Sequence, residues 1–303
     1  MRTHTPGQRD AKAREVRMHA VNDTPYLSVV ATSRNDDHGG NLALRMQLFV
    51  QCLMAQAQRH RLKTELILVE WNPPADRPRL REALRFDAHH PFCSVRIVEV
   101  PAAIHARYRH AQALPVYQMI AKNVGIRRAR GRFVLATNVD IVFSDPLFAR
   151  LAKQDLQSGR CYRSIRHDVD NALTSGMPVE AVLDYCQSHL IRVNQRDCSL
   201  NVRDGSRHVV YRPGVSEERL GHPKLFTNGC GDFTLLSQED WFRLRGYAEL
   251  DMFSFHLDSL FLHCAHYAGI AEHVFPADHV HYHVEHQEGW TPEIHRDRTL
   301  DAR

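Results

Sequence analysis

The sequence lacks any apolar run long enough to cross a membrane. Within its 303 residues no stretch approaches the roughly 20 consecutive apolar residues that a transmembrane helix needs. The polar, basic stretch 1–24 also lacks the apolar segment of a signal peptide. We therefore expect no transmembrane segment and interpret residues 1–24 as a flexible tail.

The cysteines lack any paired spacing. Seven of them are scattered along the chain, and no Cys-x-x-Cys motif occurs. An odd, dispersed set favours neither a zinc ribbon nor a disulfide framework. The simplest location for such a protein is a reducing cytoplasm.

Two phosphate-binding loops are absent, and neither sign of charge dominates. No Gly-x-Gly-x-x-Gly follows the first predicted strand, which argues against a dinucleotide-binding dehydrogenase, and no P-loop motif is present. Lysine and arginine total 39 against 35 aspartates and glutamates. This balance argues against a nucleic-acid partner and leaves room for a local basic pocket that binds a small anion.

What the sequence does contain is a regular alternation of predicted strands and helices. Short apolar runs rich in β-formers predict buried strands at 26–32, 65–70, 94–100 and 133–137. Apolar periodicity, charge and end signals predict helices between them at 42–57, 77–86 and 115–131. This order predicts an α/β fold with a mostly parallel sheet flanked by helices, whose ligands bind at the carboxyl ends of the strands.

Beyond about residue 167 the alternation fails. The stretch 168–226 is polar and interrupted, with one predicted helix at 179–193, and a last clear helix is predicted at 254–268. Repeats, low-complexity tracts and linkers are absent from the sequence. We therefore predict a single domain over residues 25–303 with a less regular C-terminal half.

The strongest local motif is an Asn-x-Asp at the end of the strand that precedes residue 138. Asn138 and Asp140 carry short, oxygen-bearing side chains two positions apart, which predicts that they point the same way and hold one hard divalent cation. Such a cation can neutralise the charge of a departing diphosphate. The alternative is a simple turn, because Asn and Asp favour turns for their own hydrogen-bonding reasons.

Residues 121–140 contain the pattern Ala-x-Asn-x-Gly-x-x-x-Ala-x-Gly followed by that strand. This block resembles the core of the GT-A, family 2-like nucleotide-sugar glycosyltransferases, in which the strand ends in a metal-binding Asp-x-Asp. Asn138 replaces the first aspartate, and Asp140 matches the second, the metal ligand proper. The resemblance implies a Mn²⁺ or Mg²⁺ cofactor, a nucleotide-binding half at about 25–145 and an acceptor half at about 146–303.

The same resemblance implies donor-binding roles at the strand ends. The loop 33–36 matches the place that holds nucleobase and ribose, and Glu70 matches an acid that often recognises the base. Helix or turn capping is the alternative for Glu70, and plain solvation is the alternative for Lys122. The predicted donor-binding residues are Ser33, Arg34, Asn35, Glu70, Lys122, Asn123 and Asn138.

The block 226–237 has two glycines around a cysteine, which is typical of backbone that closely approaches a ligand. In the family a similar segment lies over the donor sugar, so the resemblance implies that Asn228, Gly229 and Asp232 contact substrate. Asp258 matches the family's general base, which deprotonates the acceptor hydroxyl and gives inversion. Its usual acidic neighbour is Leu257 here, and capping or ion pairing is the alternative for Asp258.

Four histidines follow near the C-terminus, at His279, His281, His283 and His286. Strand alternation predicts His281 and His283 on one face. Because some GT-A enzymes complete their metal site with a C-terminal histidine, the resemblance implies that one of these two joins Asp140. A solvated histidine surface and a zinc site are the alternatives, although zinc prefers a fuller nitrogen or sulfur set.

These observations predict a glycosyltransferase that moves a sugar from a nucleotide diphosphate-sugar, with UDP favoured, to a hydroxyl of a glycan or small molecule. One rival is a sugar-phosphate nucleotidyltransferase, although loop 33–40 is acidic ahead of its two glycines. The other rival is an inactive nucleotide-sugar-binding protein, which Asn138 and Leu257 favour. The sequence makes no prediction of oligomeric state.

Overall fold

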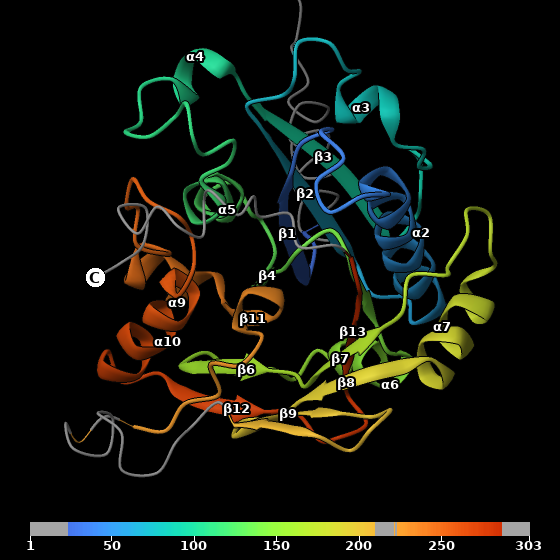
Figure 1. Ribbon diagram of the computed structural model, residues 1–303. Helices are drawn as coiled ribbons and strands as arrows, with labels where there is room; N and C mark the ends of the chain where they lie inside the picture. The colour runs from blue at the N-terminus through green and yellow to red at the C-terminus, as the bar shows by residue number, and fades with distance from the viewer. Residues whose placement is uncertain (1–23, 210–220, 222, 287–303) are drawn as a thin grey trace, which may run out of the picture.

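The computed structural model describes residues 24–209, 221 and 223–286 (Figure 1), so the predicted tail lies almost wholly outside the described residues. Four parallel strands form one end of the main sheet, in the order β3-β2-β1-β4, with β3 at the edge. They are β1 (Leu27–Ser33), β2 (Thr64–Trp71), β3 (Cys93–Val100) and β4 (Phe133–Ala136). The predicted α/β class with a parallel-rich sheet flanked by helices is confirmed.

Three further strands extend this sheet beyond β4. β11 (Thr234–Ser237) pairs antiparallel with β4 and with β6 (Arg160–Arg163), and β12 (Ala271–Val274) pairs parallel with β6. The main sheet therefore has seven strands, in the order β12-β6-β11-β4-β1-β2-β3.

Both faces of the main sheet are covered by helices. Leu27 and Val29 of β1 pack in the cluster that includes α2 (Leu42–Arg59), whereas Val30 packs in the cluster of α5 (Gln118–Ile126). Successive strand residues face opposite sides, so a strand buried on both faces reads as an uninterrupted apolar run. α9 (Gln238–Leu244) and α10 (Leu257–Tyr267) lie on the α5 side (Figure 1).

The C-terminal half builds a second, mostly antiparallel sheet of six strands, in the order β10-β9-β8-β7-β13-β5. Its strands are β5 (Ile141–Phe143), β7 (Arg166–Val169), β8 (Leu190–Asn194), β9 (Cys198–Asn201), β10 (Arg207–Val209) and β13 (His281–Val284). β13, the last described strand in the chain, lies between β7 and β5.

Several predicted helices are shorter in the structure than in the sequence pattern. α7 (Val179–Ser188) ends before residue 190, because residues 190–194 pair with β7 as a strand. The prediction of helix up to residue 193 is therefore wrong, since long-range strand pairing overrides the local pattern. The helix predicted at 77–86 is reduced to a single turn, α3 (Leu80–Ala83), and the one predicted from 254 begins at Leu257.

The remaining helices are short connectors. They are α4 (Ala102–His105), α6 (Asp145–Ala152) and the 3₁₀ helix η1 (Cys230–Asp232). None of the helices within residues 24–209, 221 and 223–286 is both long enough and apolar enough to span a membrane.

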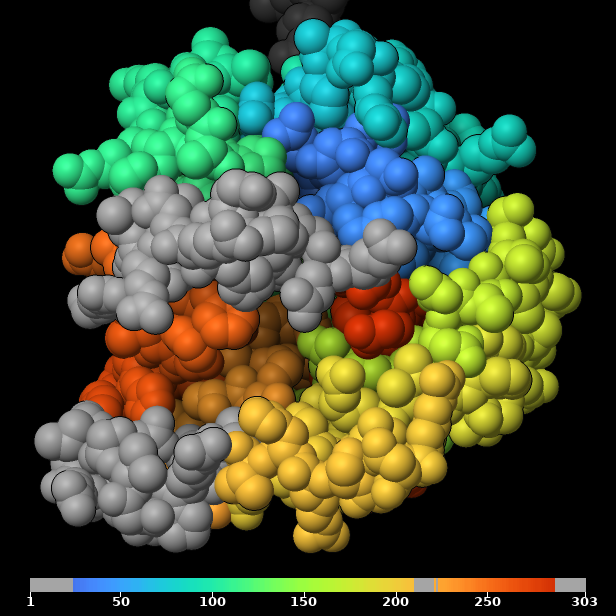
Figure 2. Space-filling model, viewed as in Figure 1, coloured from blue at the N-terminus to red at the C-terminus, as the bar shows by residue number. Residues whose placement is uncertain are grey.

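The chain passes between the two sheets directly after β4. Residues 137–140 form a turn, and β5 then enters the second sheet beside β13. On the face shown in Figure 2 the surface is hollowed between the blue N-terminal elements and the yellow strands of the second sheet, and red atoms of the last described segment lie in the hollow.

Candidate metal and active site

Asp140 lies at the junction of the two sheets, with only 8% of its surface exposed. Its Oδ2 atom is 3.1 Å from Nη1 of Arg45, 3.3 Å from Nε2 of His286 and 3.8 Å from Nε2 of His283. Its Oδ1 atom is buried and has no hydrogen-bond partner among the described residues. One oxygen of the carboxylate therefore lacks a hydrogen-bond donor among the described residues. A buried acceptor without a donor destabilises the fold, so a ligand at this oxygen would be favourable.

The surroundings of Asp140 fit a divalent cation. One ligand atom each from Asp140, His283 and His286 lies within 4.8 Å of the others. Burial opposes ionisation of Asp140, but His283, His286 and Arg45 outweigh it and hold the pKa of this carboxyl well below its usual value. A permanently ionised carboxylate beside two imidazoles is a mixed oxygen and nitrogen donor set that several divalent metals accept.

The two histidines that alternation places on one face of β13 have different contacts. His283 reaches Asp140, whereas His281 is fully buried, stacks on Phe233 at 5.6 Å and contacts the Ser164 hydroxyl through Nδ1 at 3.1 Å. Burial lowers the pKa of His281 to about 3, which is typical of a neutral core histidine. The ligand group contains His286 in place of His281.

Asn138 and Asp140 also take different partners. Asn138 donates to Oδ1 of Asp232 at 2.6 Å and accepts from Gln118 at 2.8 Å, while Asp140 faces Arg45 and the histidines. Strand alternation does not apply to residues 137–140, because they lie beyond the end of β4. That both side chains hold one cation stays a prediction. Asn138 positions Asp232.

His283 lies between two carboxylates, and its tautomer depends on which neighbour its Nδ1 atom meets. Nδ1 is 3.0 Å from Nη2 of Arg166 and 3.4 Å from Oδ1 of Asp168. An arginine only donates, so the first contact needs a bare Nδ1, whereas the second needs an N–H. Only the contact with Asp168 leaves the Nε2 lone pair free to face a cation beside Asp140.

Arg166 joins this group to the loop that follows Gly229. It bonds Asp168 through Nε at 2.5 Å and Asp232 through Nη1 at 2.7 Å. Burial disfavours its charge, but the two carboxylates outweigh burial and raise the pKa of Arg166 above its usual value. The methylene groups of Arg166 pass close to Gly229, where a Cβ atom would lie only 3.1 Å from Cδ.

Asn228 sits at the entrance of the same loop. Its amide donates to the Gln195 carbonyl at 3.0 Å and to the Ser199 hydroxyl at 3.1 Å. Gly229 has a positive φ of 64°, a conformation that glycine adopts without strain. The segment predicted over the donor sugar is therefore tied to β9 and to the residue that follows β8.

Lys122 is buried inside the molecule. Its side chain is 0% exposed, and Nζ donates to the Gly231 carbonyl at 2.8 Å. Burial lowers the pKa of Lys122, while Asp232, Asp258 and Asp140 act in the opposite direction. Lys122 thus holds the segment that carries Gly231 and Asp232. In this conformation its ammonium group does not extend to a phosphate in solvent.

Asp258 lies in the first turn of α10 and is half-buried. Its Oδ1 atom accepts the N–H of Ser259 at 2.8 Å. Its Oδ2 atom faces Gly231, where an added Cβ would come within 2.9 Å. The carboxylate therefore borders the loop that carries Asp232.

Two residues of the first-strand loop are held by local contacts. Arg34 donates to the Pro115 carbonyl at 3.1 Å and pairs with Asp36 at 3.1 Å. The Ser33 hydroxyl lies 3.1 Å from the sulfur of Met46. These side chains connect the end of β1 to α2 and to the segment before α5.

Asn35 and Glu70 both hold the start of α3. Asn35 donates to the Pro78 carbonyl at 3.0 Å, and Oε1 of Glu70 accepts the N–H of Leu80 at 2.9 Å. Burial raises the pKa of Glu70. Its contacts are those of a helix cap, the alternative that the sequence left open.

The side-chain amide of Asn123 forms hydrogen bonds inside the fold through both its nitrogen and its oxygen. Its amide donates to the Tyr247 carbonyl and to Glu249, both at 2.9 Å, and its Oδ1 accepts the N–H of Tyr247 at 2.9 Å. A Cβ on Gly246 would lie 2.2 Å from that oxygen. Asn123 therefore fastens α5 to the segment after α9, which explains the asparagine on an apolar helix face.

Sequence reasoning missed three residues of this site. Arg45 shares the buried face of α2 with Leu42 and Phe49, so its position within the apolar periodicity was a usable signal. His286 lies just beyond β13, where alternation no longer applies. Asp168 lies in a stretch without readable pattern, and it carried no signal.

No protein-family model and no curated protein matches this chain. Among solved structures, residues 1–349 of TarS from S. aureus, a glycosyltransferase, match with a TM-score of 0.44 and 12% sequence identity. The match covers 85% of this chain and 60% of that one, so the chain spans less than two thirds of that structure. Residue roles do not carry over from a likeness of this degree.

Proposed function

We propose that the protein is a metal-dependent glycosyltransferase that uses a nucleotide diphosphate-sugar. The observation that carries the proposal is the group of Asp140, His283 and His286, in which the buried Oδ1 of Asp140 has no hydrogen-bond partner within the described part of the chain. The group lies just beyond the carboxyl end of β4, and open α/β sheets bind their ligands at such ends.

The donor set favours Mn²⁺ over Mg²⁺. Mg²⁺ demands oxygen ligands and retains several waters, whereas imidazole nitrogens suit later divalent metals. When bound, the metal would supply charge stabilisation to the departing diphosphate. Zn²⁺ is the second candidate, because two histidines and one carboxylate with an open position are a catalytic zinc pattern.

Asp258 is the proposed base. Its carboxylate would take the proton of the acceptor hydroxyl as that oxygen bonds to the anomeric carbon, while the bond from this carbon to the diphosphate oxygen breaks. A base on the face opposite the leaving group gives inversion. The closeness of Asp258 to Gly231 and to the loop of Asp232 supports a position beside the donor sugar.

The test is a screen of UDP-, GDP- and dTDP-sugars with Mn²⁺, in which release of the nucleoside diphosphate is measured. Asp140→Ala is expected to lower the rate by about 100-fold or more, in line with removal of a transition-state electrostatic contact. Full turnover by Asp140→Ala, or in EDTA, contradicts the metal role. Pyrophosphate release from a nucleoside triphosphate and a sugar phosphate would identify a nucleotidyltransferase, and tight binding without turnover would identify an inactive binding protein.

A further inference from the structure

Arg45 contacts the same carboxylate oxygen of Asp140 that faces the two histidines. Its Nη1 atom lies 3.1 Å from Oδ2 of Asp140, and the side chain is only 3% exposed. Its other hydrogen bonds go to the backbone carbonyls of His38 and Gly40. Asp37 acts on it electrostatically but more weakly than Asp140, so Asp140 is the main ionic partner of this buried cation.

The charges closest to Asp140 are balanced before any metal binds. One carboxylate faces one guanidinium, and the two histidines bind metals as neutral imidazoles. A divalent cation would leave this inner group with two excess positive charges. Like charges repel more strongly in a protein interior than in water, so an anion that joins the metal-loaded site would be strongly favoured.

We propose that Arg45 couples metal binding to diphosphate binding, because its guanidinium competes with the divalent cation for Asp140 and turns to the diphosphate once the cation is bound. This inference rests on the proposed function and adds to it the coupling between metal and donor. In the free protein the guanidinium weakens the metal site. In the complex it becomes a ligand of the donor.

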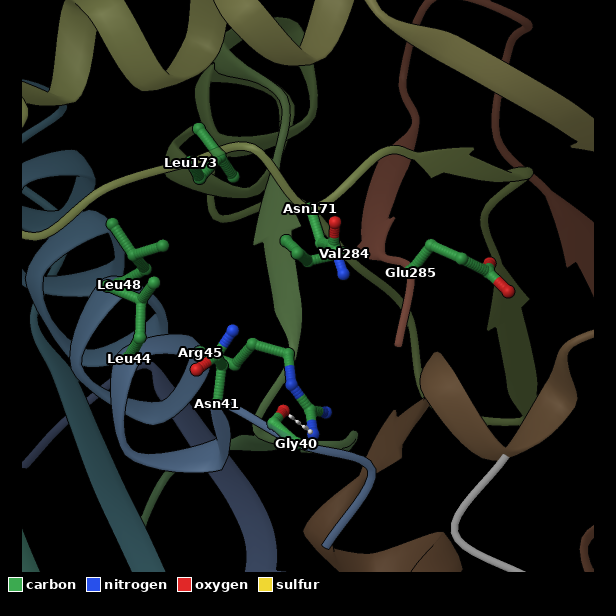
Figure 3. A pocket seen from close by; sticks show the side chains of 9 residues that line it. All are labelled: Gly40, Asn41, Leu44, Arg45, Leu48, Asn171, Leu173, Val284 and Glu285. Carbon is green, nitrogen blue, oxygen red and sulfur yellow. Dashed lines mark hydrogen bonds between the residues drawn. The ribbon is translucent and has the colours of Figure 1, made fainter. Parts of the chain in front are cut away.

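Figure 3 shows Arg45 among the residues that line a small pocket. The side chain borders this pocket between the start of α2 and β13, and its guanidinium lies over the Gly40 carbonyl. Its Nε atom is buried without a hydrogen-bond partner among the described residues. A guanidinium presents several donors in a plane that matches phosphate oxygens, so rotation of the side chain alone would give it a better set of acceptors.

Equilibrium dialysis of Mn²⁺ against the purified protein, with and without inorganic pyrophosphate, tests the coupling, because the excess metal on the protein side is the protein-bound metal. In wild type, pyrophosphate should raise the Mn²⁺ affinity by about tenfold or more, within the usual range of site-to-site coupling. Arg45→Met should bind Mn²⁺ alone about tenfold more tightly than wild type and lose most of the pyrophosphate effect. Arg45→Lys should keep part of that effect.

Arg59→Met is the matched control, because Arg59 lies on the same helix and pairs with Asp145 and Glu180 away from the site. It should behave as wild type. Equal Mn²⁺ affinity and an equal pyrophosphate effect in wild type and Arg45→Met would overturn the coupling and leave the proposed function intact. Absence of Mn²⁺ binding to folded wild type under both conditions would instead overturn the metal site itself. Should Arg45→Met not fold, the graded response of Arg45→Lys decides.

Discussion

The buried carboxylate of Asp168 contacts Nδ1 of His283, and this contact determines whether Nε2 of the ring has a free lone pair. Asp168 is 0% exposed and is held by Arg166, Arg192 and Asn194 while it faces Nδ1 of His283. Burial opposes its ionisation, but His283 and Arg166 hold the pKa of Asp168 well below its usual value. Asp168 therefore stays a carboxylate and supports the tautomer that turns the Nε2 lone pair towards Asp140.

Asp168→Asn should consequently weaken Mn²⁺ binding by about 10- to 100-fold, the usual effect of losing a carboxylate behind a ligating histidine. The amide lacks the charge that competes with Arg166 for Nδ1. Equilibrium dialysis with Mn²⁺ measures the effect, and Asp170→Asn, two residues further along, is the control. An unchanged affinity in Asp168→Asn would show that metal binding does not depend on the charge of Asp168.

At the residue scale, the sequence predicted the members of the site that follow a readable strand. Asp140 could be singled out because it belongs to an Asn-x-Asp motif that follows a buried strand, and His283 because it lies in a histidine-rich strand. The choice between His281 and His286 could not be made, because it depends on Phe233 and Ser164 lying against His281. Such contacts between distant segments leave no trace in local spacing.

Among the elements, β2 carries a buried acid that links three parts of the main sheet. Glu65 accepts hydrogen bonds from Ser28 at 2.6 Å, from Arg130 at 2.5 and 3.1 Å, and from Arg96 at 3.1 Å. Burial opposes ionisation of Glu65, but these donors outweigh it and lower its pKa from 4.5. The stabilisation is therefore complete above the unfolded-state pKa and is lost as the pH falls through the lower, folded-state pKa.

Glu65→Gln should lower the free energy of unfolding at neutral pH by about 2 kcal/mol, because it removes charge-assisted hydrogen bonds. The variant should also lose less stability than wild type between about pH 5 and about pH 3. Urea unfolding at both ends of this range measures the difference. Equal acid-induced losses in the two proteins would mean that Glu65 keeps an unshifted pKa.

The turn between α5 and β4 lies against β1 at a glycine. A Cβ on Gly131 would lie 2.6 Å from the backbone nitrogen of Ser28, so the turn has no room for a side chain. Gly131→Ala should destabilise the fold by about 3 kcal/mol, as overpacking against backbone does. Gly159→Ala is the control, since that site is open and only its positive φ should cost about 1 kcal/mol. Similar losses of stability in the two variants would argue against a close approach at Gly131.

The elements that the sequence predicted well are those whose pattern is local. The four parallel strands are short runs rich in apolar, β-forming residues, and α2 has a regular apolar face, so both could be predicted from local pattern. β8, β9 and β10 could not, because their residues are largely half-exposed or exposed and so give no apolar pattern. The sequence pattern therefore did not predict the second sheet.

Across the whole molecule, the proposed ligands come from both sheets and from residues as far apart as Asp140 and His286. A ligand bound between them is lost on global unfolding, so it should stabilise the entire fold. Mn²⁺ with UDP at about 100 times the dissociation constant should add about 2.7 kcal/mol, or roughly 5 °C or more in Tm. Differential scanning fluorimetry measures the shift, which Asp140→Ala should abolish. A full shift in that variant would place the ligand elsewhere.

The position of β13 between β7 and β5 has a consequence for biosynthesis. The parallel strands β1 to β4 and the carboxylate of Asp140 emerge from the ribosome early, whereas both imidazoles belong to residues made after all other described strands. A nascent chain can therefore build its sheet while Asp140 is still neutralised by Arg45 alone. On this arrangement the protein would complete the proposed cation site only after translation has passed residue 286.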